Sequence, residues 1–220
     1  MNLKIFDDWP SDKATKRLIY LGFIVLLINY PFMIYLTVIS YYPAIFIESQ
    51  LSFSGPLIRS HFREMTSEQI QIYIISILLD DVYDFCQVTM FTGLSLYIAR
   101  KFDEDSAWRN TGYKMVIIGF IGSVCDVIEN TFIIMMASDP QGFPDSWAVA
   151  HSCFATIKFI LWGIQAIWII WADVKLFKSD VFSKKPFLLA IGVVFAQHWP
   201  TVGFGLLYIL GVDIAALVYG

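Results

Sequence analysis

Three carboxylates fall within five residues of a long apolar segment. Asp80, Asp81 and Asp84 follow the apolar residues 70–79 and precede the apolar stretch 88–99. A charged side chain at the centre of a bilayer costs about 2.5–3.5 kcal/mol on insertion scales. A membrane helix with a purely structural role has no use for three such groups, so this stretch indicates a functional site.

Two further groups of polar residues have helical spacing. Asp126, Glu129 and Asn130 are related by i, i+3 and i+4, so they share one stripe of a helix. His151 and Lys158 lie on a later apolar segment, about two helical turns apart. We expect both groups to face the first three acids in the interior of one helical bundle.

The charges in this region are unbalanced. Five acids would surround Lys158, and they cannot all be ionised in a low dielectric beside a single counter-charge. Either some are protonated or a cation binds among them. Carboxylates with amide oxygens suit Mg²⁺ or Ca²⁺, and a histidine ligand would shift the preference toward Zn²⁺ or Mn²⁺. The expected metal ligands are Asp80, Asp84, Asp126 and Glu129.

Asp84, Asp126 and Glu129 are also the predicted catalytic residues, because carboxyl groups can act as general acids and bases. Lys158 or Arg59 would meet an anionic group of the ligand. Lys158 is equally consistent with a structural ion pair, for which Asp81 is the alternative partner. The residues expected to line the site are Asn29, Arg59, Tyr73, Gln87, Asn130, His151, Lys158 and His198.

Two short motifs resemble a known family. Asp80-Asp81-Val82-Tyr83-Asp84 fits the pattern D-D-x-x-D, and residues 126–130 supply a second acidic motif. The pair is similar to the motifs of Mg²⁺-dependent prenyl-diphosphate enzymes, and the resemblance implies metal binding. Membrane-embedded members of that group have more helices and a longer chain, and their motifs lie near cytoplasmic loops. The likeness is confined to these two segments.

The composition indicates the class of protein in which these residues lie. Of the 220 residues, 57% are hydrophobic and 15% are charged, whereas soluble domains carry about 25% charged residues. The chain is therefore expected to be an integral membrane protein, with the lipid bilayer as a partner and no nucleic acid. The apolar run from residue 17 is too long for a cleaved signal peptide. The three cysteines of the chain lie in apolar segments and predict no disulfide framework.

The pattern predicts an all-α polytopic bundle. A polar N-terminal arm, 1–16, precedes a single transmembrane domain, 17–220. The loop 42–66 is amphipathic and predicts a short helix on the membrane surface, where it could act as a lid. The last apolar stretch is either one kinked span or two short ones, which gives five spans or six. The expected spans are 17–41, 67–101, 107–138, 145–176 and 187–219.

Basic residues near the span ends predict the orientation. They are abundant in the arm and in the connections 100–114 and 175–185, and they are absent from the loop 139–145. By the positive-inside rule the N-terminus is cytoplasmic, and the loops 42–66 and 139–145 face outside. We expect the protein in the plasma membrane.

The polar groups lie in the middle and outer half of the predicted bundle, so we expect a blind cavity open to the outside. The first hypothesis is a membrane-embedded enzyme or ligand-binding protein that acts on a lipid or a small amphiphile. A second is a proton- or cation-coupled transporter or channel, and a third is a structural or assembly subunit. The sequence leaves the oligomeric state and the reaction open.

Overall fold

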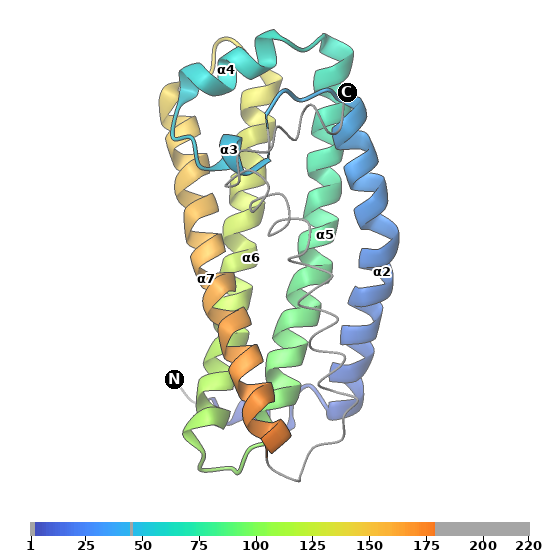
Figure 1. Cartoon of the computed structure of the whole chain (residues 1–220), viewed down its shortest axis with the longest axis vertical. Coiled ribbons are helices and arrows are strands. Elements are labelled where there is room, and N and C mark those ends of the chain that lie inside the picture. Colours follow the sequence, from blue (N-terminus) through green and yellow to red (C-terminus); the bar gives the residue numbers. More distant parts are fainter. Residues whose placement is uncertain (1–2, 45, 179–220) are drawn as a thin grey trace. The chain divides into compact units, whose positions relative to one another are not determined.

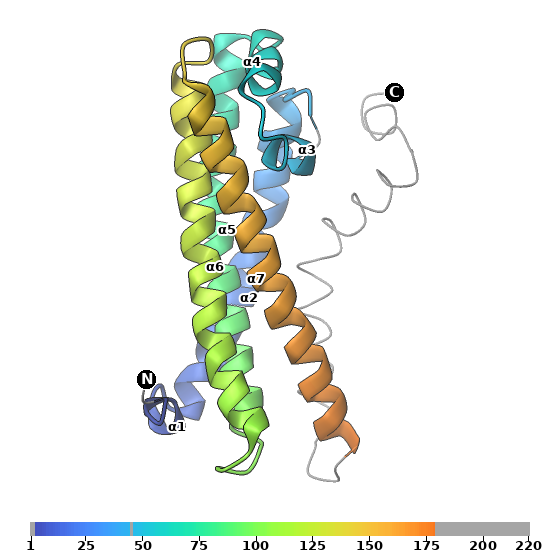
Figure 2. The same ribbon diagram turned by 90° about the vertical axis from the view of Figure 1, so that its left-hand side faces the viewer.

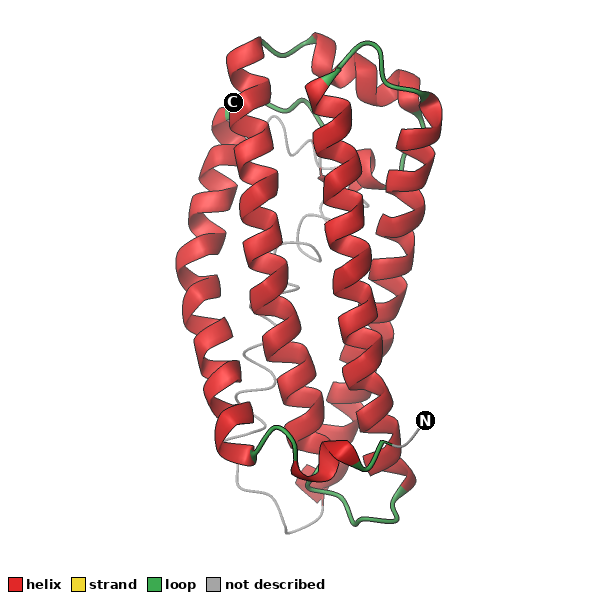
Figure 3. Ribbon diagram, turned by 180° about the vertical axis from the view of Figure 1, so that it is seen from behind, coloured by secondary structure: helices red, strands yellow, loops and turns green. Residues whose placement is uncertain are grey.

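The computed structural model describes residues 3–44 and 46–178 of the chain. Every regular element in these two ranges is a helix (Figure 3). Three are short and four are long, and residues up to Ile169 form one compact unit. The helices are α1 (Ile5–Asp8), α2 (Asp12–Ile39), α3 (Phe46–Gln50), α4 (Gly55–Arg63), α5 (Ser67–Ala99), α6 (Ala107–Ser138) and α7 (Asp145–Lys178).

The long helices run antiparallel to their neighbours in the sequence (Figure 1). Helix α2 packs against α5, and α5 packs against α6. Small residues set the close approach of α2 and α5: a Cβ added to Gly22 would lie 2.6 Å from the Thr89 hydroxyl oxygen and 2.9 Å from the Cys86 carbonyl oxygen. Glycine at such a crossing lets two helix backbones approach closely.

The predicted helix boundaries agree closely with the observed ones from α5 onward. Helix α6 spans the predicted residues, and α5 begins at the predicted Ser67, where Thr66 and Gln69 form a capping box. The N-terminal arm is shorter than expected, because α2 already begins at Asp12, with its first turn capped by Ser11. The loop 42–66 contains two short helices, α3 and α4, in place of one. The predicted span 187–219 lies outside the described residues.

The N-terminal arm is tied to α5 and α6 at one end of the bundle (Figure 2). The guanidinium of Arg109 lies 2.6 Å from Asp7, and the Tyr113 hydroxyl donates to the same carboxylate oxygen at 2.6 Å. These two donors hold the pKa of Asp7 below its ordinary value. Arg100 donates to the backbone carbonyl of Phe6 and to Asp12. The arm therefore folds back on the bundle.

At the opposite end, α4 is held to the start of α7. Arg59 donates to the carbonyl of Phe143 at 3.0 Å and lies 2.5 Å from the Asp145 carboxylate. Arg63 reaches Gln141 in the same connection. Arg59 was expected to line the acidic site, but in the structure its partners are Phe143 in the α6–α7 connection and Asp145 at the start of α7. The loops 42–66 and 139–145 do share one end of the bundle, as expected.

Three of the described helices, α2, α6 and α7, are long and apolar enough to cross a membrane. Helix α5 has the length, but it carries the acidic stretch and is not among the three. Large apolar side chains point outward along the bundle; Ile28 on α2 is 72% exposed and Phe85 on α5 is 64% exposed. Such apolar outer faces are unfavourable in water and suit a protein surrounded by lipid.

Candidate functional site

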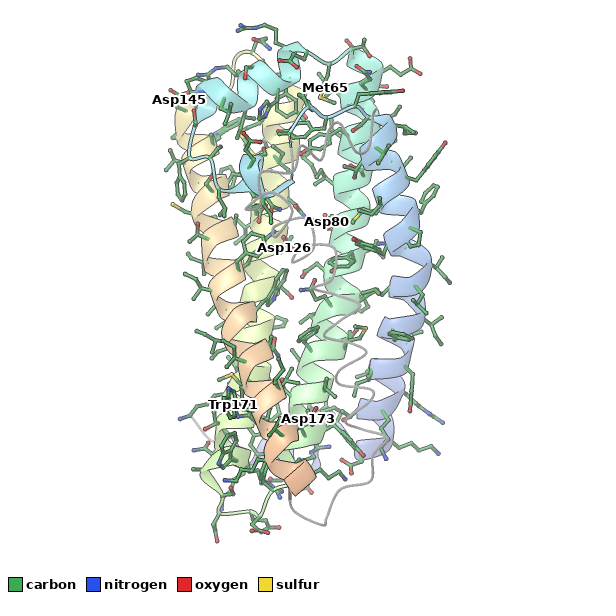
Figure 4. All side chains as sticks on the ribbon, in the orientation of Figure 1. Met65, Asp80, Asp126, Asp145, Trp171 and Asp173 are labelled. Atoms are coloured by element: carbon green, nitrogen blue, oxygen red, sulfur yellow. The ribbon has the colours of Figure 1, made fainter. Side chains whose placement is uncertain are left out.

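Helices α6 and α7 meet in a regular antiparallel register, which brings their polar residues together. Lys158 on α7 contacts Asp126 on α6, and one layer further along Trp162 lies against Gly122. Asp80 on α5 lies near the level of Asp126 on α6 (Figure 4). We call Asp80, Asp126, Glu129, Asn130, His151 and Lys158 the buried cluster, since each of these residues is at least nine-tenths buried.

Lys158 is the cation of the buried cluster. Its ammonium group donates to Asp126 Oδ1 and lies 2.5 Å from Glu129 Oε2. The ring centroid of Trp162 lies 5.8 Å from the same ammonium, within the range of a cation–π contact. The structural ion pair considered for Lys158 is therefore present, although its partners are Asp126 and Glu129 and not Asp81. Since two carboxylates already hold this ammonium, a role in binding an anion is not supported.

The acids of α5 are joined to α6 through Asn130. Its amide nitrogen donates to Asp80 Oδ2 at 3.2 Å and to Asp81 Oδ1 at 2.9 Å. Asn29 of α2 donates to the backbone carbonyl of Leu79 at 2.9 Å. Asn29 thus fixes the α2–α5 contact next to Asp80, because its side-chain nitrogen donates the hydrogen bond that joins the two helices.

Glu129 and His151 have polar atoms without hydrogen-bond partners. His151 Nδ1 lies 3.2 Å from the backbone carbonyl oxygen of Glu129. A carbonyl oxygen only accepts, so Nδ1 carries the proton. The imidazole is buried and its nearest carboxylate oxygen lies beyond hydrogen-bond distance, which favours the neutral ring, and Nε2 is then an acceptor. Nε2 and Glu129 Oε1 are 3.9 Å apart, and neither has a hydrogen-bond donor among the residues that the structure describes.

A small cavity lies beside these two acceptors. Its volume is about 10 Å³, which is the space of a single water molecule. Glu129, Asn130 and His151 contribute its polar wall, and Tyr73, Ile77 and Ile133 contribute ring and aliphatic surface. Ser49 and Gln50 of α3 line it from the loop side. The cavity is thus much smaller than the open pocket that the sequence suggested.

The segment over the cavity is held by Tyr42. Its ring stacks on Tyr73 with the centroids 4.4 Å apart, and its hydroxyl lies 2.7 Å from Ser49 Oγ and 3.3 Å from His61 Nδ1. Burial raises the pKa of Tyr42 to about 12, so the phenol is neutral at ordinary pH. Tyr42 connects the end of α2 with α3, α4 and α5, and this connection keeps Ser49 and Gln50 at the cavity.

The described residues do not support the predicted metal binding. The part of the chain that the structure describes contains no group of three histidine, cysteine, aspartate or glutamate side chains arranged to hold a metal ion. The physical reason is that Lys158 places its ammonium between Asp126 and Glu129, where the sequence suggested a cation. Asp84 is also buried, but its Oδ1 atom has no hydrogen-bond partner.

Toward the α1 end the polar contacts change character. Gln165 on α7 donates to Ser95 on α5 and to the backbone carbonyl of Met115 on α6. Trp162 occupies the layer between Lys158 and Gln165, because its indole Nε1 would lie 2.6 Å from a Cβ added to Gly122. The buried cluster and the Gln165 contacts are separate polar layers.

Of the predicted site residues, the structure brings together Asp80, Asp126, Glu129, Asn130, His151 and Lys158, and it adds Tyr73 at the cavity. Gln87 is buried on α5, with Oε1 lacking a hydrogen bond. His198 lies outside the described residues. Ser49 and Gln50 were missed, although they belong to the segment predicted to be a lid.

Comparisons with models of known families, with curated proteins and with solved structures gave no match to this chain.

Proposed function

We propose that this chain is a multi-pass membrane protein that binds a small amphiphile. The polar group of the ligand enters the cavity between Glu129 and His151, and its apolar part contacts Ile77 and Ile133. In this proposal residues 187–219 form a fifth span, α4 lies on the membrane surface, and the α4 end of the bundle faces outside. The segment 42–63 covers the site.

One observation carries the proposal. Two buried acceptors, Glu129 Oε1 and His151 Nε2, lack donors within residues 3–44 and 46–178 and belong to residues that line the same cavity. Leaving a buried polar group unsatisfied costs about 1–3 kcal/mol, and a ligand that donates to these atoms recovers that cost. Intramembrane ionisable groups usually mark functional sites for this reason.

The cavity volume requires the cover to move. A space of about 10 Å³ holds a water and no larger group. Ser49 and Gln50 sit on a helix of five residues, and the side chain of Ser49 is held through Tyr42. Displacement of this short helix opens the cavity without disturbing the ion pairs of Lys158 on the other side of Glu129.

The contacts of Trp162 favour ligand binding over transport. A proton- or cation-coupled transporter needs a polar route through the bundle, and the layer after Lys158 is filled by an indole ring. The next polar residue, Gln165, already donates to Ser95 and Met115. A purely structural role for the buried cluster is the remaining rival, and it predicts no bound amphiphile.

The test compares two substitutions on the same helix. Ile77→Phe fills the cavity, whereas Ile75→Phe adds the same atoms at a position that is 50% exposed. Native mass spectrometry of protein extracted in mild detergent is expected to find a bound amphiphile in the wild type and in Ile75→Phe. Ile77→Phe is expected to lose it. A wild-type protein without bound amphiphile, or equal occupancy in both variants, contradicts the proposal.

A further inference from the structure

The chemistry of the cavity restricts the polar group that it can take. Among the described residues, those that line it include one carboxylate, Glu129, and no lysine or arginine. The nearest cation of the cluster, Lys158, is held by Asp126 and by the other oxygen of Glu129. An anionic group in the cavity would therefore face a carboxylate without a free counter-charge.

The two unpartnered atoms are both acceptors. Because Nδ1 of His151 donates to the backbone carbonyl of Glu129, the free Nε2 of the neutral ring can only accept. Glu129 Oε1 is a carboxylate oxygen and also only accepts. The atoms are 3.9 Å apart, so one ligand atom placed between them can reach both. That atom needs at least two hydrogens to donate, which a hydroxyl group lacks.

The charges of the cluster favour an ammonium group over a water molecule as the occupant of the cavity. In the buried cluster the ammonium of Lys158 contacts the carboxylates of Asp126 and Glu129, and Asp80 adds a third acid, which accepts from Asn130. A second positive charge reduces this imbalance, and water does not. Asp84, also buried, adds a further acid on α5.

We infer that the ligand is an amphiphile with a primary amine, whose ammonium donates to Glu129 Oε1 and His151 Nε2. This inference rests on the proposed function, because it names the ligand class of the same site. The alkyl chain leaves the cavity past Ile77 and the segment 46–50. Lys158 remains paired with Asp126 and with Glu129 Oε2, so one carboxylate is shared by two ammonium groups.

Three probes of equal chain length test the inference. The full-length protein in nanodiscs of neutral phosphatidylcholine is titrated with dodecylamine, dodecanol or dodecanoate, and saturable binding is measured by calorimetry against empty nanodiscs. Dodecylamine is expected to bind best. Glu129→Gln is expected to weaken dodecylamine binding about tenfold or more, because a charge-assisted hydrogen bond is lost.

Glu68→Gln, a change at an exposed position in the first turn of α5, serves as the matched control and is expected to bind as the wild type does. Ile77→Phe, which fills the cavity without changing a charge, provides a second test should Glu129→Gln fail to fold. Preferential binding of dodecanol or dodecanoate that Ile77→Phe abolishes overturns the amine inference and leaves the proposed function standing. Binding of none of the three overturns both, and a water then occupies the cavity.

Discussion

At the scale of single residues, Lys158 determines how the acids of this protein can be buried. Its side chain is 3% exposed, and its ammonium contacts two carboxylates whose side chains are 2% and 1% exposed. A buried ion pair is weak evidence for added stability, since desolvation offsets most of the attraction. Removing only one partner is costly, because the remaining charge is left without compensation.

Lys158→Met is therefore expected to lower the free energy of unfolding by about 3–5 kcal/mol. The triple variant Lys158→Met, Asp126→Asn, Glu129→Gln removes all three charges and is expected to recover most of that loss. Thermal unfolding in the same detergent measures both. Equal destabilisation by the single and the triple variant would show that the methylene chain of Lys158, and not its charge, is what matters.

The α2–α5 contact gives a test of packing at one atom. Gly22→Ala is expected to destabilise the protein by about 1–3 kcal/mol, because the added Cβ meets the Cys86 carbonyl at 2.9 Å. Gly163 is the matched control, since a Cβ there has no heavy atom within 4 Å. Gly163→Ala is expected to be neutral or to stabilise by about 0.5–1 kcal/mol through helix propensity. A loss of equal size at both sites would contradict the packing argument.

At the scale of elements, the sequence predicted the long helices well and the site only in part. The limits of α6 follow from an apolar run between two turns, and the capping box places the start of α5. Helical spacing correctly brought Asp126 and Glu129 to one stripe facing Lys158. Spacing along a helix cannot report how neighbouring helices are rotated, so it left open whether Lys158 pairs with Asp81; in the structure its partners are Asp126 and Glu129.

Because spacing along the sequence does not report how helices and loops pack, it also could not predict the partners of Arg59 or the identity of the cation among the acids. An arginine in an amphipathic loop can reach any carboxylate near its end of the bundle, and in the fold that carboxylate is Asp145. Four acids predict a cation, but they do not say whether it is a metal or a lysine. Only the register of α6 against α7 decides that Lys158 fills this place.

The cover over the cavity is expected to loosen in mild acid. Burial lowers the pKa of His61, while Glu48 and Glu64 raise it to a smaller extent. Since the pKa of the folded state lies below the ordinary 6.5, the neutral ring favours the folded segment. This stability is present above pH 6.5 and is lost as the pH falls toward the pKa of the folded state.

Hydrogen exchange measures how the stability of α4 depends on pH, once the rates are corrected for the intrinsic effect of pH. Amides of α4, residues 55–63, are expected to lose protection between about pH 7 and pH 5. In His61→Asn this pH dependence is expected to disappear, while amides in the centre of α6 stay protected in both proteins. A pH dependence that persists in the variant would show that His61 is not its origin.

At the scale of the whole molecule, the described fold places the connections 100–106 and 139–144 at opposite ends of α6. Helix α6 is long and apolar enough to cross a membrane, so these connections are expected on opposite sides of it. The basic residues near 100–114 predict that the first connection is cytoplasmic. Contacts of Arg59 and Arg63 place α4, the part of the covering segment from residue 55 to 63, on the same side as the second connection.

Labelling of single cysteines with a membrane-impermeant maleimide tests whether α6 crosses the membrane and whether the connection 100–106 is cytoplasmic. Asp105→Cys and Gln141→Cys are introduced separately after Cys153, the exposed native cysteine, is replaced by alanine. In intact cells Gln141→Cys is expected to react, and Asp105→Cys is expected to react only after permeabilisation. The reverse pattern would keep the span and invert the orientation, which would place the cavity cover in the cytoplasm. Reaction of both cysteines in intact cells would rule out a crossing by α6, because its two ends would then lie on one side.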